Sequence, residues 1–122
     1  MKNPAYELGR KAEAEAVAYL QDLGYEIKEL NWHTDHLEID IIARDGDELV
    51  IVEVKARSSR TYEQPVEAIT NKKIRFLVNA AEAYIQEHES MLDTRFDVIS
   101  IVYSGDGFVL EHFKDAFYPP VN

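Results

Sequence analysis

The chain has 122 residues, 46% of them hydrophobic, and carries a formal net charge of -10 with no cysteine. This length and apolar content predict a single domain over residues 1–122, with one substantial core and no disulfide framework. The acidic balance argues against broad adhesion to nucleic acid. No apolar signal core or membrane-length apolar stretch is visible, so we expect a soluble cytoplasmic protein.

The predicted elements follow the order αβββαββ. Apolar residues at helical spacing predict a first helix over 8–23, which ends at Gly24, and a second helix over about 70–88 after a loop over 57–64. Strands are predicted over 25–32, 37–43, 49–56, 96–103 and 108–113, and an extended tail over 119–122. The residues expected to be buried are Ala12, Ala16, Tyr19, Leu20 and Leu23 on the first helix, and Ile74, Leu77, Val78, Ala81 and Ile85 on the second.

The strands over 37–43 and 49–56 are separated by an Asp-Gly turn, which predicts a β-hairpin. Two registers are open, because Arg44 can pair either with Asp47 or with Leu49. In a regular hairpin both registers give each residue the same face, although a bulge would change this. The apolar residues expected on one face are Ile42, Leu49 and Ile51, and those expected on the other are Ile39, Ile41, Val50, Val52 and Val54.

Acidic residues and one lysine share a face of this hairpin. The first register places Glu38 opposite Glu53, the second places Asp40 opposite Glu53, and Lys55 lies on the same face in both. Neighbouring carboxylates repel unless a cation or a lysine neutralises them. Such a set could hold a hard cation and a water for phosphodiester hydrolysis. The alternative is a solvated sheet face with Lys55 in a cross-strand salt bridge.

Basic residues concentrate between Lys55 and Arg75. This segment contains six basic and two acidic residues, a net charge of +4, whereas the rest of the chain has 7 basic and 21 acidic residues, a net charge of -14. We therefore expect a cationic rim that grips a phosphate backbone. The alternative is that the basic residues of the second helix are only its exposed side. The expected nucleic-acid contacts are Arg57, Arg60, Lys72, Lys73 and Arg75, with Lys73 favoured most.

The histidines give weaker signals. His33 and His36 belong to a polar turn, and no zinc-ligand spacing is present. His88 and His112 have no partner that the sequence makes visible. Trp32 could stack on a base, although burial explains it equally well.

Five short motifs resemble a known family. They are G-R-x-x-E at 9–13, N-W at 31–32, E-I-D-I-I-A at 38–43, V-E-V-K-A-R at 52–57 and R-F-D-V at 95–98. With the element order, they are similar over residues 8–117 to the YraN-type family of predicted endonucleases, within the PD-(D/E)XK nuclease superfamily. The resemblance implies an α/β, restriction-endonuclease-like fold with a mixed central sheet of about five strands flanked by helices.

The resemblance also implies roles for particular residues. Asp40 and Glu53 would be ligands of Mg²⁺ or Mn²⁺, with the backbone carbonyl of Val54 as a further oxygen donor. Lys55 would lie beside the attacking water or the scissile phosphate. Glu13 matches an extra acid that some members direct at the same metal, whereas its sequence context alone equally allows an exposed helix face.

The implied function is metal-dependent hydrolysis of DNA, favoured over RNA, by a structure- or end-directed endonuclease in recombination or repair. A homodimer could span two strands, although no sequence feature requires it. The alternative is a catalytically inactive nuclease-fold module that binds nucleic acid or protein. Its motivation, besides the acidic body of the chain, is Leu37. Both Leu37 and Ala12 occupy positions where the family pattern has glycine, and Ala12 is the milder change. Leu37 bears on the shape of the site entrance, because glycine at a strand start permits close approach of a ligand.

Overall fold

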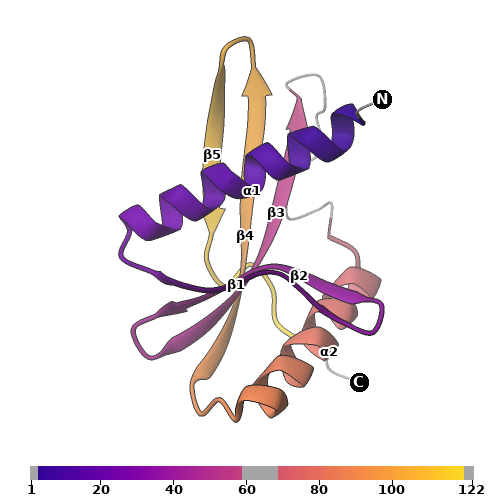
Figure 1. The fold of residues 1–122 in the computed structure, drawn as a ribbon, viewed down its shortest axis with the longest axis vertical. Helices are drawn as coiled ribbons and strands as arrows, with labels where there is room; N and C mark the ends of the chain where they lie inside the picture. Colours follow the sequence, from indigo (N-terminus) through magenta and orange to yellow (C-terminus); the bar gives the residue numbers. More distant parts are fainter. Residues whose placement is uncertain (1–2, 59–68, 120–122) are drawn as a thin grey trace.

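The computed structural model describes residues 3–58 and 69–119, which form one five-stranded sheet in the order β1-β2-β3-β4-β5. Strands β3 and β4 pair in parallel and the other neighbours pair antiparallel, so the sheet is mixed. The order is the predicted αβββαββ, and the fold is α/β and restriction-endonuclease-like (Figure 1). The elements are α1 (Pro4–Asp22), β1 (Glu26–Thr34), β2 (Leu37–Asp45), β3 (Glu48–Ser58), α2 (Asn71–His88), β4 (Asp93–Ser104) and β5 (Gly107–Phe113).

Helix α1 begins at Pro4, earlier than the predicted start at residue 8. Asn3 caps it, because its side chain accepts hydrogen bonds from two backbone N–H groups of the first turn, and proline at the first helical position suits this start. The predicted burial of Leu23 is wrong: this residue lies beyond the last turn and is 49% exposed. Tyr19 is half-buried, and the buried residues of α1 are Ala12, Ala16 and Leu20.

Helix α2 begins after Thr70, whose side chain accepts a hydrogen bond from the N–H of Lys73. The buried stripe is rotated from the predicted one. Tyr84 is 3% exposed and packs edge-on against Trp32 of β1, with ring centroids 5.2 Å apart, so the buried side of the helix includes Tyr84. The buried residues are Leu77, Ala80, Ala81 and Tyr84, whereas Ile74, Val78 and Ile85 are half-buried.

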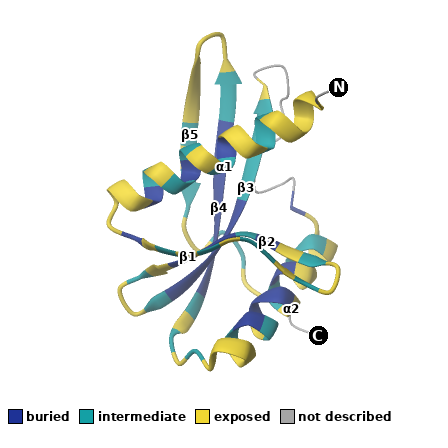
Figure 2. Cartoon of the chain, viewed as in Figure 1, coloured by how far each residue is buried: buried dark blue, intermediate teal, exposed yellow. Residues whose placement is uncertain are grey.

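The sheet has a separate apolar core on each face (Figure 2). Helix α1 covers one core, in which Ile41, Ala43, Val50 and Val52 are buried, and helix α2 covers the other, in which Ile42, Leu49 and Ile51 are buried. Both faces of β2 and β3 are therefore buried, as predicted. No helix in the described ranges combines the length and apolar character needed to cross a bilayer. The predicted tail over 119–122 lies outside these ranges beyond Pro119.

Candidate active site

The hairpin adopts the second of the two predicted registers, in which Arg44 pairs with Leu49. The ladder between β2 and β3 ends at the pair Ile41 and Val52, whereas β3 continues beside β4 as far as Ser58. Beyond Val52, β3 pairs with β4 and has no ladder to β2. A backbone N–H on this edge needs another acceptor.

Asp40 supplies that acceptor. Its Oδ2 accepts a hydrogen bond of 2.9 Å from the backbone N–H of Val54, so the side chain bridges the gap where the two strands separate. The prediction that Asp40 and Glu53 share a face assumed regular alternation along β2, and this assumption is wrong. Ile39 packs in the core under α2 although Ile41 packs in the core under α1, and residues two apart in a regular strand would share a face.

The same irregularity appears on β1. Leu30 pairs with Ile41 and Trp32 pairs with Ile39, so Asn31 lies across from Asp40. Asn31 has a φ of 50°, a left-handed conformation that asparagine tolerates better than most residues. The regular alternation of side chains between the two faces of the sheet is therefore broken at Asn31 on β1 and at Asp40 on β2. The sequence indicated Asn31 only as part of a family motif. The tolerance of asparagine for a left-handed backbone is the local feature that could have pointed to this break.

Glu53 lies beside this gap and is 5% exposed. Its Oε2 is 3.9 Å from Nζ of Lys55, on the same strand, and 3.5 Å from Nζ of Lys73, in the first turn of α2. Both distances are longer than good hydrogen bonds, so these contacts are ion pairs. Lys73 was predicted as a contact to nucleic acid, and the structure brings it to the carboxylate pair.

Asp40 and Glu53 interact strongly. Burial, and next the charge of Glu53, raise the pKa of Asp40 from 3.8 to about 7, although the hydrogen bond from the Val54 N–H opposes this shift. Ionising both carboxylates is therefore unfavourable because the two negative charges repel. A cation between them would remove this repulsion.

Glu13 approaches the same place from helix α1. With Asp40, Val54 and Lys55 it lines a pocket of about 290 Å³. Its Oε1 accepts a hydrogen bond of 2.9 Å from Nδ2 of Asn31. Burial is the largest cause that raises the pKa of Glu13, and the hydrogen bond from Asn31 opposes it. Glu13 thus belongs to the surroundings of the pair rather than to a plain exposed helix face.

The donor set fits a divalent cation that is also held by water and substrate. Within residues 3–58 and 69–119, no three His, Asp or Glu side chains gather closely enough to enclose an ion. Mg²⁺ commonly uses one or two protein carboxylates and completes its shell with waters and phosphate oxygens. Asp40 and Glu53 supply such a pair, and Asp40 Oδ1 makes no hydrogen bond to the described residues.

Three other predicted rim residues, Arg57, Lys72 and Arg75, make no ion pair with Asp40 or Glu53 in the described part of the chain. Arg57 is half-buried on β3, and its Nε has no hydrogen-bond partner in the described part of the chain. Lys72 is exposed over the ring of Phe76, with 5.6 Å from Nζ to the centroid, and Arg75 is exposed. Arg60 lies outside the described residues.

The histidines have partners that the sequence did not reveal. His33 Nε2 lies 3.3 Å from Glu38 Oε1, across the β1–β2 turn. His112 Nε2 lies 2.7 Å from Oδ2 of the buried Asp97, which also accepts two hydrogen bonds from Arg95. The R-F-D-V motif therefore forms a buried network and does not reach the candidate site.

The chain is similar to other proteins over nearly its whole length. A family model described as "Uncharacterised protein family UPF0102" matches residues 12–101, a range that includes every residue of the site described above. A UPF0102 protein of Parabacteroides distasonis is 45% identical over 114 residues, 93% of this chain and 94% of the relative. Similar proteins of Phocaeicola vulgatus and Chlorobium chlorochromatii are 42% and 44% identical, and each alignment covers at least 94% of both chains.

Proposed function

The chain belongs to the UPF0102 family, as its YraN-type motifs predicted, and we propose that it is a metal-dependent nuclease of the PD-(D/E)XK superfamily that hydrolyses phosphodiester bonds in DNA. One observation carries the proposal. The carboxylates of Asp40 and Glu53 repel each other where β2 leaves β3, and two lysine side chains lie close to Glu53. A purely structural site gains little from two adjacent buried acids.

Asp40 and Glu53 would hold Mg²⁺ or Mn²⁺, with the Val54 carbonyl as a further donor. When bound, the cation supplies Lewis-acid stabilisation of phosphate charge and lowers the pKa of water. The protein contributes preorganisation, because Asp40 is fixed by the Val54 N–H and Glu53 is fixed between β3 and α2.

The lysines take the roles that a carboxylate pair cannot fill. Lys55 is placed to orient the attacking water or to contact the scissile phosphate, because its ammonium group is a compact and mobile donor. Lys73 neutralises Glu53 before substrate binds and can turn toward a phosphate oxygen afterwards. Glu13 lines the same pocket, where its carboxylate could accept a hydrogen bond from water or join the cation shell.

Charge bears on which part of the chain would hold a nucleic acid. The net charge of -10 disfavours nonspecific adhesion, so binding would rest on the basic segment from Lys55 to Arg75. We favour DNA over RNA and structured or end-bearing substrates in the cytoplasm, as in recombination or repair.

A cleavage panel tests the proposal. Purified protein is incubated with single-stranded, duplex and branched DNA in Mg²⁺, Mn²⁺ or EDTA, beside the Asp40→Asn and Glu53→Gln variants. The expected result is cation-dependent cleavage of at least one substrate that both variants lose. Cleavage that persists in EDTA or in either variant would contradict the assignment.

The alternative is a noncatalytic nuclease-fold module. The observation in its favour is that Lys55 and Lys73 already balance Glu53 without a cation. Calorimetric titration with Mn²⁺ separates the two, since a module of this kind would bind no cation through Asp40 and would cleave nothing.

A further inference from the structure

A second pocket lies on the α2 face of the sheet, at the opposite end of that helix from Lys73. It has a volume of about 400 Å³ and is lined by Lys28, Arg44, Leu49, Tyr84, His88, Ser90, Met91 and Leu92. Lys73 and His88 are separated by about 22 Å along the helix axis at a rise of about 1.5 Å per residue. The pocket is therefore distinct from the carboxylate site.

The lining is basic in a strongly acidic protein. It contains Lys28, Arg44 and the imidazole of His88, and no acidic residue. Two of these groups have acidic neighbours: Nζ of Lys28 is 3.9 Å from Glu26, and the ring nitrogens of His88 are 4.0 and 3.8 Å from Glu29 and Glu87. These distances are too long for strong hydrogen bonds. Nδ1 of His88 lies 3.1 Å from the carbonyl oxygen of Tyr84, so Lys28 and Nε2 of His88 keep donor capacity for a ligand.

Arg44 is held in place by a hydrogen bond to the backbone. Its Nε donates a hydrogen bond of 2.8 Å to the carbonyl oxygen of Gly46, which fixes the side chain beside the hairpin turn. Its terminal nitrogens make no ion pair or hydrogen bond with the described residues. A fixed guanidinium with free terminal nitrogens suits bidentate binding of phosphate.

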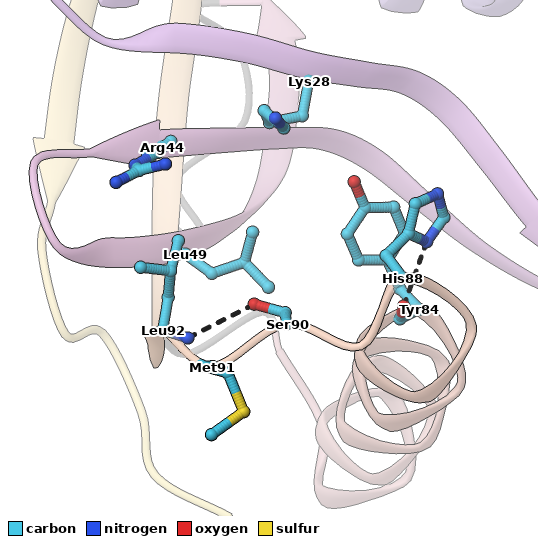
Figure 3. Close-up of a pocket in the computed structure, with 8 residues that line it drawn as sticks. All are labelled: Lys28, Arg44, Leu49, Tyr84, His88, Ser90, Met91 and Leu92. Carbon is cyan, nitrogen blue, oxygen red and sulfur yellow. Dashed lines mark hydrogen bonds between the residues drawn. The ribbon is translucent and has the colours of Figure 1, made fainter.

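The floor of the pocket is apolar and aromatic. Leu49 is 2% exposed and Tyr84 is 3% exposed, and the ring of His88 stacks on Tyr84 with centroids 4.0 Å apart. Figure 3 shows Lys28 and Arg44 on the strands, Tyr84 and His88 on the helix across from them, and Ser90, Met91 and Leu92 on the connection that follows. The side chain of His88 is 40% exposed, so part of its ring can stack on a planar group.

We propose that this pocket binds a nucleotide, with the phosphate on Arg44 and Lys28 and the base against His88 and the apolar floor. The volume suits a ligand of this size. The nucleotide could be free in solution or be the phosphorylated end of a nucleic-acid strand, because both present the same chemistry. The proposal does not depend on nuclease activity.

Titration of the full chain with four probes tests the site: a nucleoside monophosphate, the matching nucleoside, inorganic phosphate and a short 5′-phosphorylated oligonucleotide. Binding is followed by amide chemical shifts, with the Arg44→Gln and Lys28→Gln variants beside Lys114→Gln. Lys114 is exposed and outside the pocket lining, so it controls for loss of one positive charge. Arg44 is also exposed, and a thermal melt checks that each variant folds.

The expected result is saturable binding of the nucleotide or the oligonucleotide, with shifts at His88, Ser90 and Leu92. Arg44→Gln should weaken it about tenfold, and Lys114→Gln should leave it unchanged. Tighter binding of the oligonucleotide would identify a strand end as the source, and tighter binding of the monophosphate a free nucleotide. Equal affinity for nucleotide and nucleoside, binding no tighter than that of inorganic phosphate, or equal loss in Lys114→Gln would overturn the proposal.

Discussion

The carboxylate of Asp40 has a structural role and, in the proposed function, a chemical role as well. One oxygen satisfies the Val54 N–H where β2 ends its ladder with β3, so the strand separation requires an acceptor at this position. That requirement does not need a negative charge. Burial and the neighbouring Glu53 make the charged form costly and raise the pKa of Asp40 to about 7. Replacement by asparagine can therefore separate the two roles.

We expect Asp40→Asn to make the cation-free protein more stable at pH 8 by about 1–3 kcal/mol, because the amide keeps an acceptor oxygen and removes the repelled charge. Cleavage should fall to background. The pKa of Asp40 is higher in the folded than in the unfolded chain, so the wild-type protein loses stability as pH rises from 3.8 to about 7, and the variant lacks this loss. Urea unfolding in EDTA at several pH values measures the difference. Equal stability across that range would show that Asp40 carries no repelled charge.

The two lysines beside Glu53 should differ from their neighbour Lys72. Nζ of Lys55 and of Lys73 lies 3.9 and 3.5 Å from the same carboxylate oxygen, whereas Lys72 is exposed over Phe76. We expect Lys55→Gln and Lys73→Gln to reduce the single-turnover cleavage rate at saturating DNA by about tenfold or more. Lys72→Gln should change only the apparent Kd and its salt dependence. If all three variants changed affinity alone, Lys73 would belong to the rim and not to the site.

At the scale of elements, the site depends on a break in two strands. Asn31 and Asp40 lie across from each other where the strand faces change, and the Asn31 side chain donates to Glu13 on α1. Asn31 has a left-handed backbone, with a φ of 50°, at the point where its side chain reaches helix α1. Conformation and hydrogen bond at this residue can be tested separately.

Glycine and alanine at position 31 should differ in stability. Asn31→Gly removes the hydrogen bond to Glu13 and keeps access to a positive φ, whereas Asn31→Ala removes both. We expect alanine to be the more destabilising by about 1 kcal/mol, measured as the free energy of unfolding in urea. Equal costs would indicate that the left-handed conformation is not strained for alanine and that only the hydrogen bond contributes.

The sequence predicted these elements well and their local geometry less well. Periodicity and turn residues placed the hairpin, and both possible registers were visible, but the choice of Leu49 over Asp47 as the partner of Arg44 depends on packing against two helices. Regular alternation placed Ile39 on the wrong face, because a break such as that at Asp40 has no periodic signal. Lys73 reaches Glu53 only because α2 packs across the sheet, against β2 and β1, and this packing cannot be read from the sequence.

At the scale of the whole molecule, the two faces of the sheet have separate cores, and a buried polar network ties the strands together. Arg95 donates to Asp97 on its own strand, to Asp45 and Glu48 beside the hairpin turn, and to the hydroxyl of Tyr25. The sequence showed this arginine and aspartate only as a motif, since partners from distant segments cannot be read from spacing. The network joins β2, β3 and β4 at the end of the sheet opposite the site.

The pH dependence of stability should reflect this network in acid. Burial alone would raise the pKa of Asp97, but hydrogen bonds from His112 and Arg95 lower it below its ordinary value. A carboxylate with a lowered pKa in the folded state stabilises the protein fully above its unfolded pKa of 3.8, and this contribution is lost as pH falls through the lower folded value. The wild-type protein should therefore lose stability below about pH 4, in a window separate from that of Asp40.

Asp97→Asn should cost about 2–3 kcal/mol at pH 7, because Arg95 loses its buried partner while Asp45 and Glu48 remain. The variant should also show a flatter decline in stability below pH 4 than the wild-type protein. Asp93→Asn, on the same strand but exposed, is the matched control and should change stability by less than about 0.5 kcal/mol. Denaturant unfolding at pH 3 to 7 measures all three proteins. A parallel loss in wild type and Asp97→Asn would place the acid-sensitive groups elsewhere in the molecule.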